Sequence, residues 1–212
     1  MINELRIYTV KPGTVADVAR NSGTIARKIR GDDYGKLEGY WMTEIGPLNQ
    51  VVHLWSYADL NERQRLRAEL SKNTAWTGEY LPVIRPNLVR QDIRLMNPVL
   101  PLKAPDVQGS NVYELRYYRM KPGCLGEWVK HFTAALPGRE KDSKIVGLGT
   151  GEARQPNEVL HLWSYPDLNA RTAARAAAVK DPGWQEFLRK GGPLMDEMNC
   201  MIMLPSAHSP LK

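Results

Sequence analysis

Residues 53–63 read HLWSYADLNER, and residues 161–171 repeat them 108 positions later as HLWSYPDLNAR. A second pair of segments follows the same order: residues 4–13 read ELRIYTVKPG and residues 114–123 read ELRYYRMKPG. Chance does not reproduce order, spacing and rare residues such as Trp and His together. The chain therefore contains two tandem copies of one unit.

The periodicity within each copy predicts the order β-α-β-β-α-β. The first copy has a strand at residues 3–10, a helix after the turn at 11–13, a hairpin of strands at 37–43 and 50–57, and a last strand at 90–96. Asp59 and Asp167 are positioned to cap the second helix of each copy. This order predicts an α+β fold of two ferredoxin-like units, each an antiparallel sheet with helices on one side.

The domain limits follow from a proline-rich stretch between the copies. Residues 98–110 contain three prolines and end in Gly109-Ser110, which stops a helix and disfavours a central strand. We expect a first unit at residues 1–97, a linker at 98–110, a second unit at 111–205 and a loose tail at 206–212.

Alternation along the strands separates two faces of the predicted sheet. One face is aliphatic, with Leu5, Ile7 and Leu54, and the other carries charged and aromatic side chains at positions 4, 6, 8, 53, 55 and 57. Such a polar and aromatic face is poorly explained as open surface. We expect it to lie away from the helices and to pack against a second sheet, with a polar pocket between them.

The composition narrows the range of functions. With 42% hydrophobic and 25% charged residues, the chain can form an ordinary globular core. The net charge of +6 is scattered, so we expect the small arginine clusters at 27–30 and 63–67 to be solvated surface and no nucleic acid to bind. Cys124 and Cys200 lack metal-ligand spacing, so we expect no metal site. No stretch is long enough to span a membrane and no leader precedes the first strand, so we expect a cytoplasmic protein without a membrane partner.

The two repeated blocks resemble the signature segments of NIPSNAP domains. The resemblance covers nearly the whole chain, in two copies, and implies the dimeric α+β barrel superfamily, in which two ferredoxin-like sheets face each other. That superfamily includes cofactor-free monooxygenases, muconolactone isomerases and haem enzymes. Eukaryotic NIPSNAP proteins are mitochondrial, and this sequence differs from them in having no targeting leader. The resemblance therefore implies the fold more firmly than a reaction.

The charged residues of the polar face are the candidate catalytic groups. His53 and His161 could act as general bases or remain hydrogen-bonded core histidines. Arg6 and Arg116 could hold a substrate anion or could pair with the glutamates two residues before them. We expect no tightly bound cofactor, with haem bound through a histidine as the alternative.

Aromatic residues on the same strands are the candidate ligand-binding groups. Such walls suit a flat organic ligand, although packing between sheets would explain them equally well. Trp41 has Gly149 as its counterpart in the second copy, which predicts either unequal pockets in the two copies or a compensating difference in packing between them. The full set of candidates is Tyr8, Tyr118, Trp41, Trp55, Trp163, Tyr57 and Tyr165.

These residues favour a protein that binds a small organic molecule. If it is an enzyme, a cofactor-independent oxygenation or isomerisation of an aromatic or enolisable substrate fits a histidine beside an arginine. A non-enzymatic interaction protein with a packed interior is the alternative. We also expect self-association, because sheets of this kind often bury their remaining edges against another copy.

Overall fold

The computed structural model describes residues 1–106, 109 and 111–212. Two compact units divide the chain, unit 1 with Met1–Asn97 and Met203–Lys212, and unit 2 with Pro98–Ile202. Residues 107, 108 and 110 of the expected linker lie outside the described residues.

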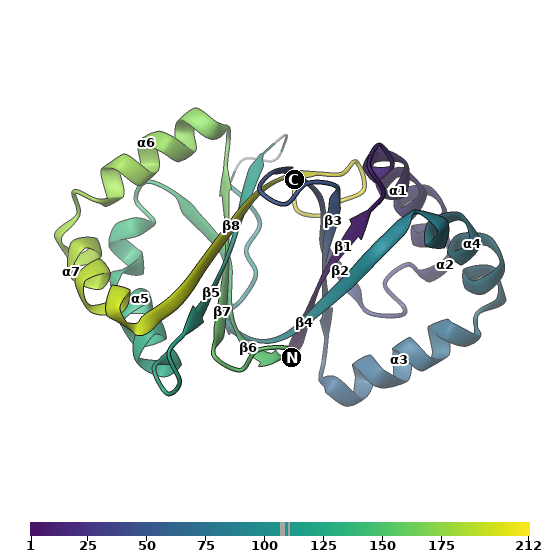
Figure 1. Ribbon diagram of the computed structural model, residues 1–212, viewed down its shortest axis with the longest axis horizontal. Helices are drawn as coiled ribbons and strands as arrows, with labels where there is room; N and C mark the ends of the chain where they lie inside the picture. Colours follow the sequence, from purple (N-terminus) through teal and green to yellow (C-terminus); the bar gives the residue numbers. More distant parts are fainter. Residues whose placement is uncertain (107–108, 110) are drawn as a thin grey trace. The chain divides into compact units, whose positions relative to one another are not determined.

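Unit 1 follows the predicted order of elements, with its helices on one side of its sheet (Figure 1). Antiparallel pairing places β1 between β3 and β4, and β3 between β1 and β2. Two π-helical turns, η1 and η2, interrupt its helices. The elements are β1 (Ile2–Val10), α1 (Val15–Asn21), η1 (Ser22–Ala26), α2 (Arg27–Arg30), β2 (Lys36–Ile45), β3 (Gln50–Tyr57), α3 (Leu60–Lys72), η2 (Trp76–Tyr80), α4 (Leu81–Ile84), the 3₁₀ turn η3 (Arg85–Asn87) and β4 (Leu88–Leu100).

Unit 2 repeats this arrangement with longer, regular helices. Its pairs β5–β7 and β6–β7 have the same register as β1–β3 and β2–β3, and α5, α6 and α7 cover one side of the sheet (Figure 1). The elements are β5 (Val112–Met120), α5 (Leu125–Arg139), β6 (Lys144–Ala153), β7 (Glu158–Tyr165), α6 (Leu168–Ala178), α7 (Pro182–Gly191), the 3₁₀ turn η4 (Gly192–Leu194) and β8 (Met195–Pro205).

Both predicted helix caps are confirmed. The Asp59 carboxylate accepts from the Glu62 backbone N–H at 2.8 Å, and the Asp167 carboxylate accepts from the Ala170 N–H at 2.7 Å. These bonds satisfy a donor that the first turn of a helix leaves without a partner.

Each unit is completed by the end of a strand from the other repeat. The last residues of β4 belong to unit 2, where the chain continues with a hydrogen bond from Lys103 N–H to the Val146 carbonyl at 2.8 Å. The end of β8 belongs to unit 1, where Ser206 N–H donates to the Tyr40 carbonyl at 2.9 Å. The hydrogen-bonded order β1-β3-β2-β8-β5-β7-β6-β4 therefore closes as an eight-stranded antiparallel barrel, which confirms the predicted α+β fold class.

The C-terminal segment differs from the loose tail that we expected. Ser206, Ser209 and Leu211 are buried within unit 1. The Ser209 hydroxyl accepts from the Tyr40 backbone N–H at 2.9 Å and donates to the Leu211 carbonyl at 2.7 Å. Its polar composition suggested a free end, but the segment satisfies the backbone groups at the edge of β2.

The polar face of the unit 1 sheet was expected to lie away from the helices, and this expectation is wrong. The polar face, with Arg6 and His53, lines a cavity together with residues of the helices. The aliphatic face, with Leu5 and Leu54, lies opposite and is also buried. Because both faces are covered, alternation alone does not identify the face that the helices contact.

Candidate functional site

A cavity of about 410 Å³ lies between the sheet and the helices of unit 1. One cross-strand row forms its floor, because β-pairing aligns Ile93, Arg6, His53 and Tyr40 on neighbouring strands. Its walls come from η1, α2, α3, η2 and α4, and from His208 of the C-terminal segment. The side chains predicted from two distant sequence blocks therefore meet in one cavity.

Arg6 is held by partners on its own strand. Its Nε donates to the Glu4 carboxylate and its Nη1 to the Tyr8 hydroxyl, and Arg63 also donates to Glu4. Burial alone would raise the pKa of Glu4, but Arg6 and Arg63 outweigh it and hold that pKa below its usual value. The structural pairing considered for Arg6 is thus present, and this guanidinium is already occupied on two sides.

Unit 2 contains a matching network around Glu114. Its carboxylate accepts from Arg116 at 2.5 Å and from Arg171 at 2.6 Å. Burial opposes ionisation, but these arginines outweigh it and lower the pKa of Glu114 to about 2. Arg116 also donates to the Tyr118 hydroxyl. Glu114 is therefore a buried carboxylate that holds the β5 arginine in place.

The histidines lack the free acceptor nitrogen that a general base requires. The Trp55 indole N–H donates to Nδ1 of His53 at 2.6 Å, and Trp163 does the same to His161 at 2.7 Å. An indole nitrogen only donates, so in the neutral imidazole the hydrogen lies on Nε2. Burial, with nearby Arg6, lowers the pKa of His53 well below its usual value. His53 is therefore a neutral side chain whose Nε2–H can donate a hydrogen bond.

Two further arginines bring uncompensated positive charge to the unit 1 cavity. Arg30 is 4% exposed and stacks on the Trp55 indole at 3.5 Å, and burial lowers its pKa to about 10. Arg67 extends from α3 into the same cavity. Within the described ranges, neither forms an ion pair with a carboxylate, and no carboxylate lines the cavity. At neutral pH the cavity is therefore cationic.

The positions of buried Arg30 and half-buried Arg63 and Arg67 correct the prediction that both basic clusters are solvated surface. Arg63 and Arg67 are four residues apart, so they share the helix face that is turned toward β1, whereas Arg65 is directed outward and pairs with Glu69 at 3.0 Å. The spacing of four residues between Arg63 and Arg67 already indicates a shared helix face in the sequence.

The corresponding cavity of unit 2 has only about 140 Å³. Trp128 and Phe132 of α5 stack at 4.8 Å between ring centroids, and Phe187 of α7 packs against both. In unit 1 the residues at the first two positions are Val18 and Ser22. Aromatic side chains from the helices therefore fill the space that is open in unit 1.

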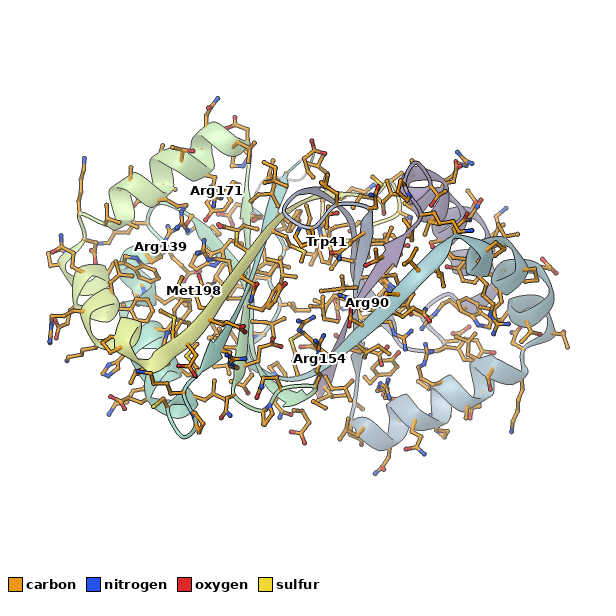
Figure 2. All side chains as sticks on the ribbon, in the orientation of Figure 1. Trp41, Arg90, Arg139, Arg154, Arg171 and Met198 are labelled. Atoms are coloured by element: carbon orange, nitrogen blue, oxygen red, sulfur yellow. The ribbon has the colours of Figure 1, made fainter. Side chains whose placement is uncertain are left out.

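The cations of the unit 2 cavity also have partners. Arg175, the counterpart of Arg67, lies 3.8 Å from the Glu114 carboxylate. Arg139, the counterpart of Arg30, donates to the Ser143 hydroxyl and, at 3.3 Å, to the Tyr165 hydroxyl. Figure 2 shows Arg139 on the helix side of the unit 2 sheet. No carboxylate lines this cavity among the described residues either, so unit 2 differs from unit 1 in its smaller volume and in the ion pair of Arg175 with Glu114.

Unequal cavities were predicted, but the residue named as the cause is wrong. Trp41 pairs with Val52 on the aliphatic face of β2 and β3, and it does not line the cavity (Figure 2). The difference arises instead from the helix residues that face His53 and His161. Alternation along the strands indicates only the residues that the strands contribute to a pocket, whereas helix residues determine the volume of these two cavities.

The remaining aromatic candidates divide into two groups. Tyr8 and Trp55 line the unit 1 cavity, and Tyr118 and Trp163 line that of unit 2. Tyr57 and Tyr165 are buried but line neither of these cavities. Across the described residues, no cluster of three or more His, Cys, Asp or Glu side chains could hold a metal ion. The same part of the chain has no helix of the length and hydropathy that a membrane span requires.

Comparisons with known proteins agree with the repeat. NipSnap homolog 1 of Danio rerio is 31% identical over 220 residues, which cover 99% of this chain and 76% of the relative. The fold is similar to crystal structures of candidate monooxygenases from Fusobacterium nucleatum (TM-score 0.73, 12% identity, 97% and 92% of the two chains) and Lactobacillus acidophilus (TM-score 0.69, 14% identity, 100% and 98%). The NIPSNAP family model matches residues 3–101 and again residues 113–210, so the chain belongs to the NIPSNAP family.

Proposed function

We propose that the cavity of unit 1 binds a small, planar organic anion. The observation that carries the proposal is the buried guanidinium group of Arg30 beside the half-buried one of Arg67, in a cavity that no carboxylate lines among the described residues. Removing a cation from water without a counter-ion costs several kcal/mol, by order of magnitude, and less for a group that keeps part of its hydration. A bound anion would offset that cost.

The shape and lining of the cavity support a flat ligand. Its volume of about 410 Å³ lies within the range of small-molecule sites. Trp55 and Trp76 contribute indole rings, and Leu81, Ile84 and Ile93 contribute aliphatic surface. A carboxylate or phenolate on a ring system would place its charge near the arginines and its apolar body against these residues.

The same geometry suits stabilisation of a conjugate base. The Nε2–H of His53 and the two guanidinium groups all favour negative charge on a ligand oxygen. An enolate or phenolate is the first species in a cofactor-independent isomerisation or oxygenation, and folds similar to that of this chain include candidate monooxygenases. In this proposal the cationic cavity lowers the pKa of the substrate, and His53 donates a hydrogen bond without removing a proton.

Titration calorimetry with 2-naphthoate and the neutral 2-naphthamide tests the proposal. We expect the wild-type protein to bind the anion at least tenfold more tightly, because a hydrogen bond to a charged group contributes about 1.5–3 kcal/mol. Arg67→Gln should remove most of this preference. The matched control is Arg175→Gln in unit 2, where the cavity is filled and the arginine lies near Glu114.

Equal affinity for the two ligands would contradict the proposal. A loss of naphthoate binding in Arg175→Gln as large as that in Arg67→Gln would also contradict it, because the site would then not belong to unit 1.

A further inference from the structure

Three hydroxyl groups meet on the helix side of Tyr40 in unit 1. The Ser22 hydroxyl of η1 lies 3.0 Å from the Tyr40 hydroxyl and 2.9 Å from the Tyr80 hydroxyl of η2. All three residues line the unit 1 cavity. We refer to Ser22, Tyr40 and Tyr80 as the hydroxyl triad.

The triad has one hydroxyl hydrogen more than it can use internally. Three hydroxyls carry three hydrogens, and the two hydrogen bonds within the triad use two of them. The described residues supply no other acceptor to these three oxygens. Because a buried donor without a partner is unfavourable, the third hydrogen is available for an acceptor in the cavity.

The tyrosines of the triad remain protonated donors. Burial raises the pKa of Tyr80 to about 12 and raises that of Tyr40 well above its usual value. The triad therefore presents an O–H group that carries no charge, which distinguishes it from the arginines of the same cavity.

Unit 2 has an apolar side chain at each triad position. Tyr40 pairs with His53 as Leu148 pairs with His161, so leucine replaces the first phenol. Ser22 corresponds to Phe132, 110 positions later, as the preceding Lys-Pro-Gly turns do. Tyr80 corresponds to Phe187, because their ring centroids lie 4.5 and 4.7 Å from those of Trp76 and Trp184. The triad is a property of the open cavity alone.

The helix that contains the first π-helical turn, η1, is one residue longer in unit 1 than the equivalent helix in unit 2. The offset between copies is 110 at Gly13 and Gly123, before α1 and α5, and 109 at Arg30 and Arg139, which lie over the equivalent rings of Trp55 and Trp163. One residue has therefore been added to unit 1 within this helix. A single insertion is what produces a π-helical turn, and such turns are frequent at functional sites.

The segment that contains the second π-helical turn, η2, is likewise one residue longer in unit 1 than in unit 2. The offset is 108 at Trp76 and Trp184 but 107 at Asn87 and Leu194, whose carbonyls accept from the equivalent Lys11 and Lys121 N–H groups. Both insertions contain or adjoin a triad hydroxyl. Two independent additions to the helices of unit 1 thus lie in the π-helical turns that carry two of the three triad residues.

We infer that the hydroxyl triad is a second subsite, which donates a hydrogen bond to an uncharged oxygen of the ligand. This inference rests on the proposed anion site and specifies the ligand further. Arg67 of the anion site lies near Arg6, whose charge acts on it more than that of any other residue. Arg6, His53 and Tyr40 lie side by side on three adjacent strands, so the backbones of Arg6 and Tyr40 are two strand spacings, about 10 Å, apart. The ligand class is therefore a planar anion that carries a carbonyl or ether oxygen at the end remote from its acidic group.

Two matched ligands test the subsite. 6-Acetyl-2-naphthoate carries a remote carbonyl, and 6-isopropyl-2-naphthoate has the same shape without an acceptor. We expect the wild-type protein to bind the acetyl compound about five- to tenfold more tightly, the effect of one hydrogen bond to a buried donor. The hydroxyl-free variant Ser22→Ala/Tyr40→Phe/Tyr80→Phe should bind both equally, with its affinity for the isopropyl compound unchanged.

Conservative single variants keep the test independent of the folding of the triple variant. When Ser22 donates to one of the two tyrosines, that tyrosine holds the free hydrogen, so either Tyr40→Phe or Tyr80→Phe should lose the acetyl preference by itself. Tyr118→Phe removes a buried phenol from unit 2 and should retain the preference. Equal binding of the two naphthoates by the wild-type protein, or retention of the preference in all triad variants, would overturn the subsite. Failure of both naphthoates to bind would instead contradict the anion site.

Discussion

At the scale of single residues, the indole N–H of a tryptophan determines the chemistry of each histidine. Trp163 donates to Nδ1 of His161, so the lone pair that a base would use is occupied and Nε2 holds the hydrogen. Burial, together with Arg116, lowers the pKa of His161 to about 3. The histidine is a neutral donor in a hydrophobic environment.

This environment predicts a loss of stability in mild acid. The unfolded histidine titrates near pH 6.5, whereas the native one stays neutral to about pH 3, so the unfolded state binds the additional proton in this window. The free energy of unfolding should therefore fall by about 1.4 kcal/mol per pH unit for His161 as the pH decreases from 6 to 5.

Urea denaturation at pH 7, 6 and 5 measures this slope. His161→Asn keeps an acceptor for Trp163 and should reduce the slope. His131→Asn, on the partly exposed surface of α5, is the control and should leave most of the slope in place. An unchanged slope in His161→Asn would contradict the assignment.

At the scale of elements, η1 positions both the triad serine and a contact with the C-terminal segment. A Cβ atom at Gly23 would lie 2.7 Å from Nδ1 of His208. A Cβ atom at Gly78, in η2, would have no neighbour within 4 Å. The two π-helical turns therefore differ in their tolerance of a methyl group.

Gly23→Ala should displace the C-terminal segment from β2, because the methyl group and the His208 ring cannot occupy the same space. The Tyr40 backbone N–H donates to the Ser209 hydroxyl, so its hydrogen exchange reports this contact. We expect faster exchange at Tyr40 in Gly23→Ala and no change in Gly78→Ala. Equal exchange rates in the two variants would show that the segment is not held through His208.

The elements themselves could be predicted because their signals are local. Asp59 and Asp167 begin helices as expected, and the strand at 50–57 has the predicted bounds. The side of the sheet that the helices cover could not be predicted, since both faces are buried and alternation is symmetric between them. The triad could not be predicted from strand alternation, because Ser22 and Tyr80 lie in helical segments. Their difference from Phe132 and Phe187 shows its meaning only once the helices are known to face the cavity.

At the scale of the whole molecule, duplication has produced two units with different interiors. The cavity of unit 2 is about 140 Å³ and is packed with aromatic rings, whereas that of unit 1 is about 410 Å³ and is lined by arginines and hydroxyls. Buried aromatic packing stabilises a fold, and an open cationic cavity does not. In the proposed division, unit 2 contributes stability and unit 1 contributes the ligand site.

Truncation of an aromatic residue in unit 2 should separate these two contributions. Phe132 is 1% exposed and packs against Trp128 and Phe187, so Phe132→Ala should lower the free energy of unfolding by about 3–5 kcal/mol. Ser22→Ala, the matched position in unit 1, should cost much less. Chemical denaturation measures both effects, and naphthoate affinity in Phe132→Ala should equal that of the wild type. A large loss of affinity in Phe132→Ala with native structure retained would contradict the division.

The crystal structure of the 2-naphthoate complex tests the central claim most directly. We expect one ligand in unit 1, with its carboxylate about 2.7–2.9 Å from guanidinium nitrogens of Arg30 or Arg67 and its rings against Trp55. A ligand bound in unit 2, or one in unit 1 with its carboxylate directed away from both arginines, would contradict the claim.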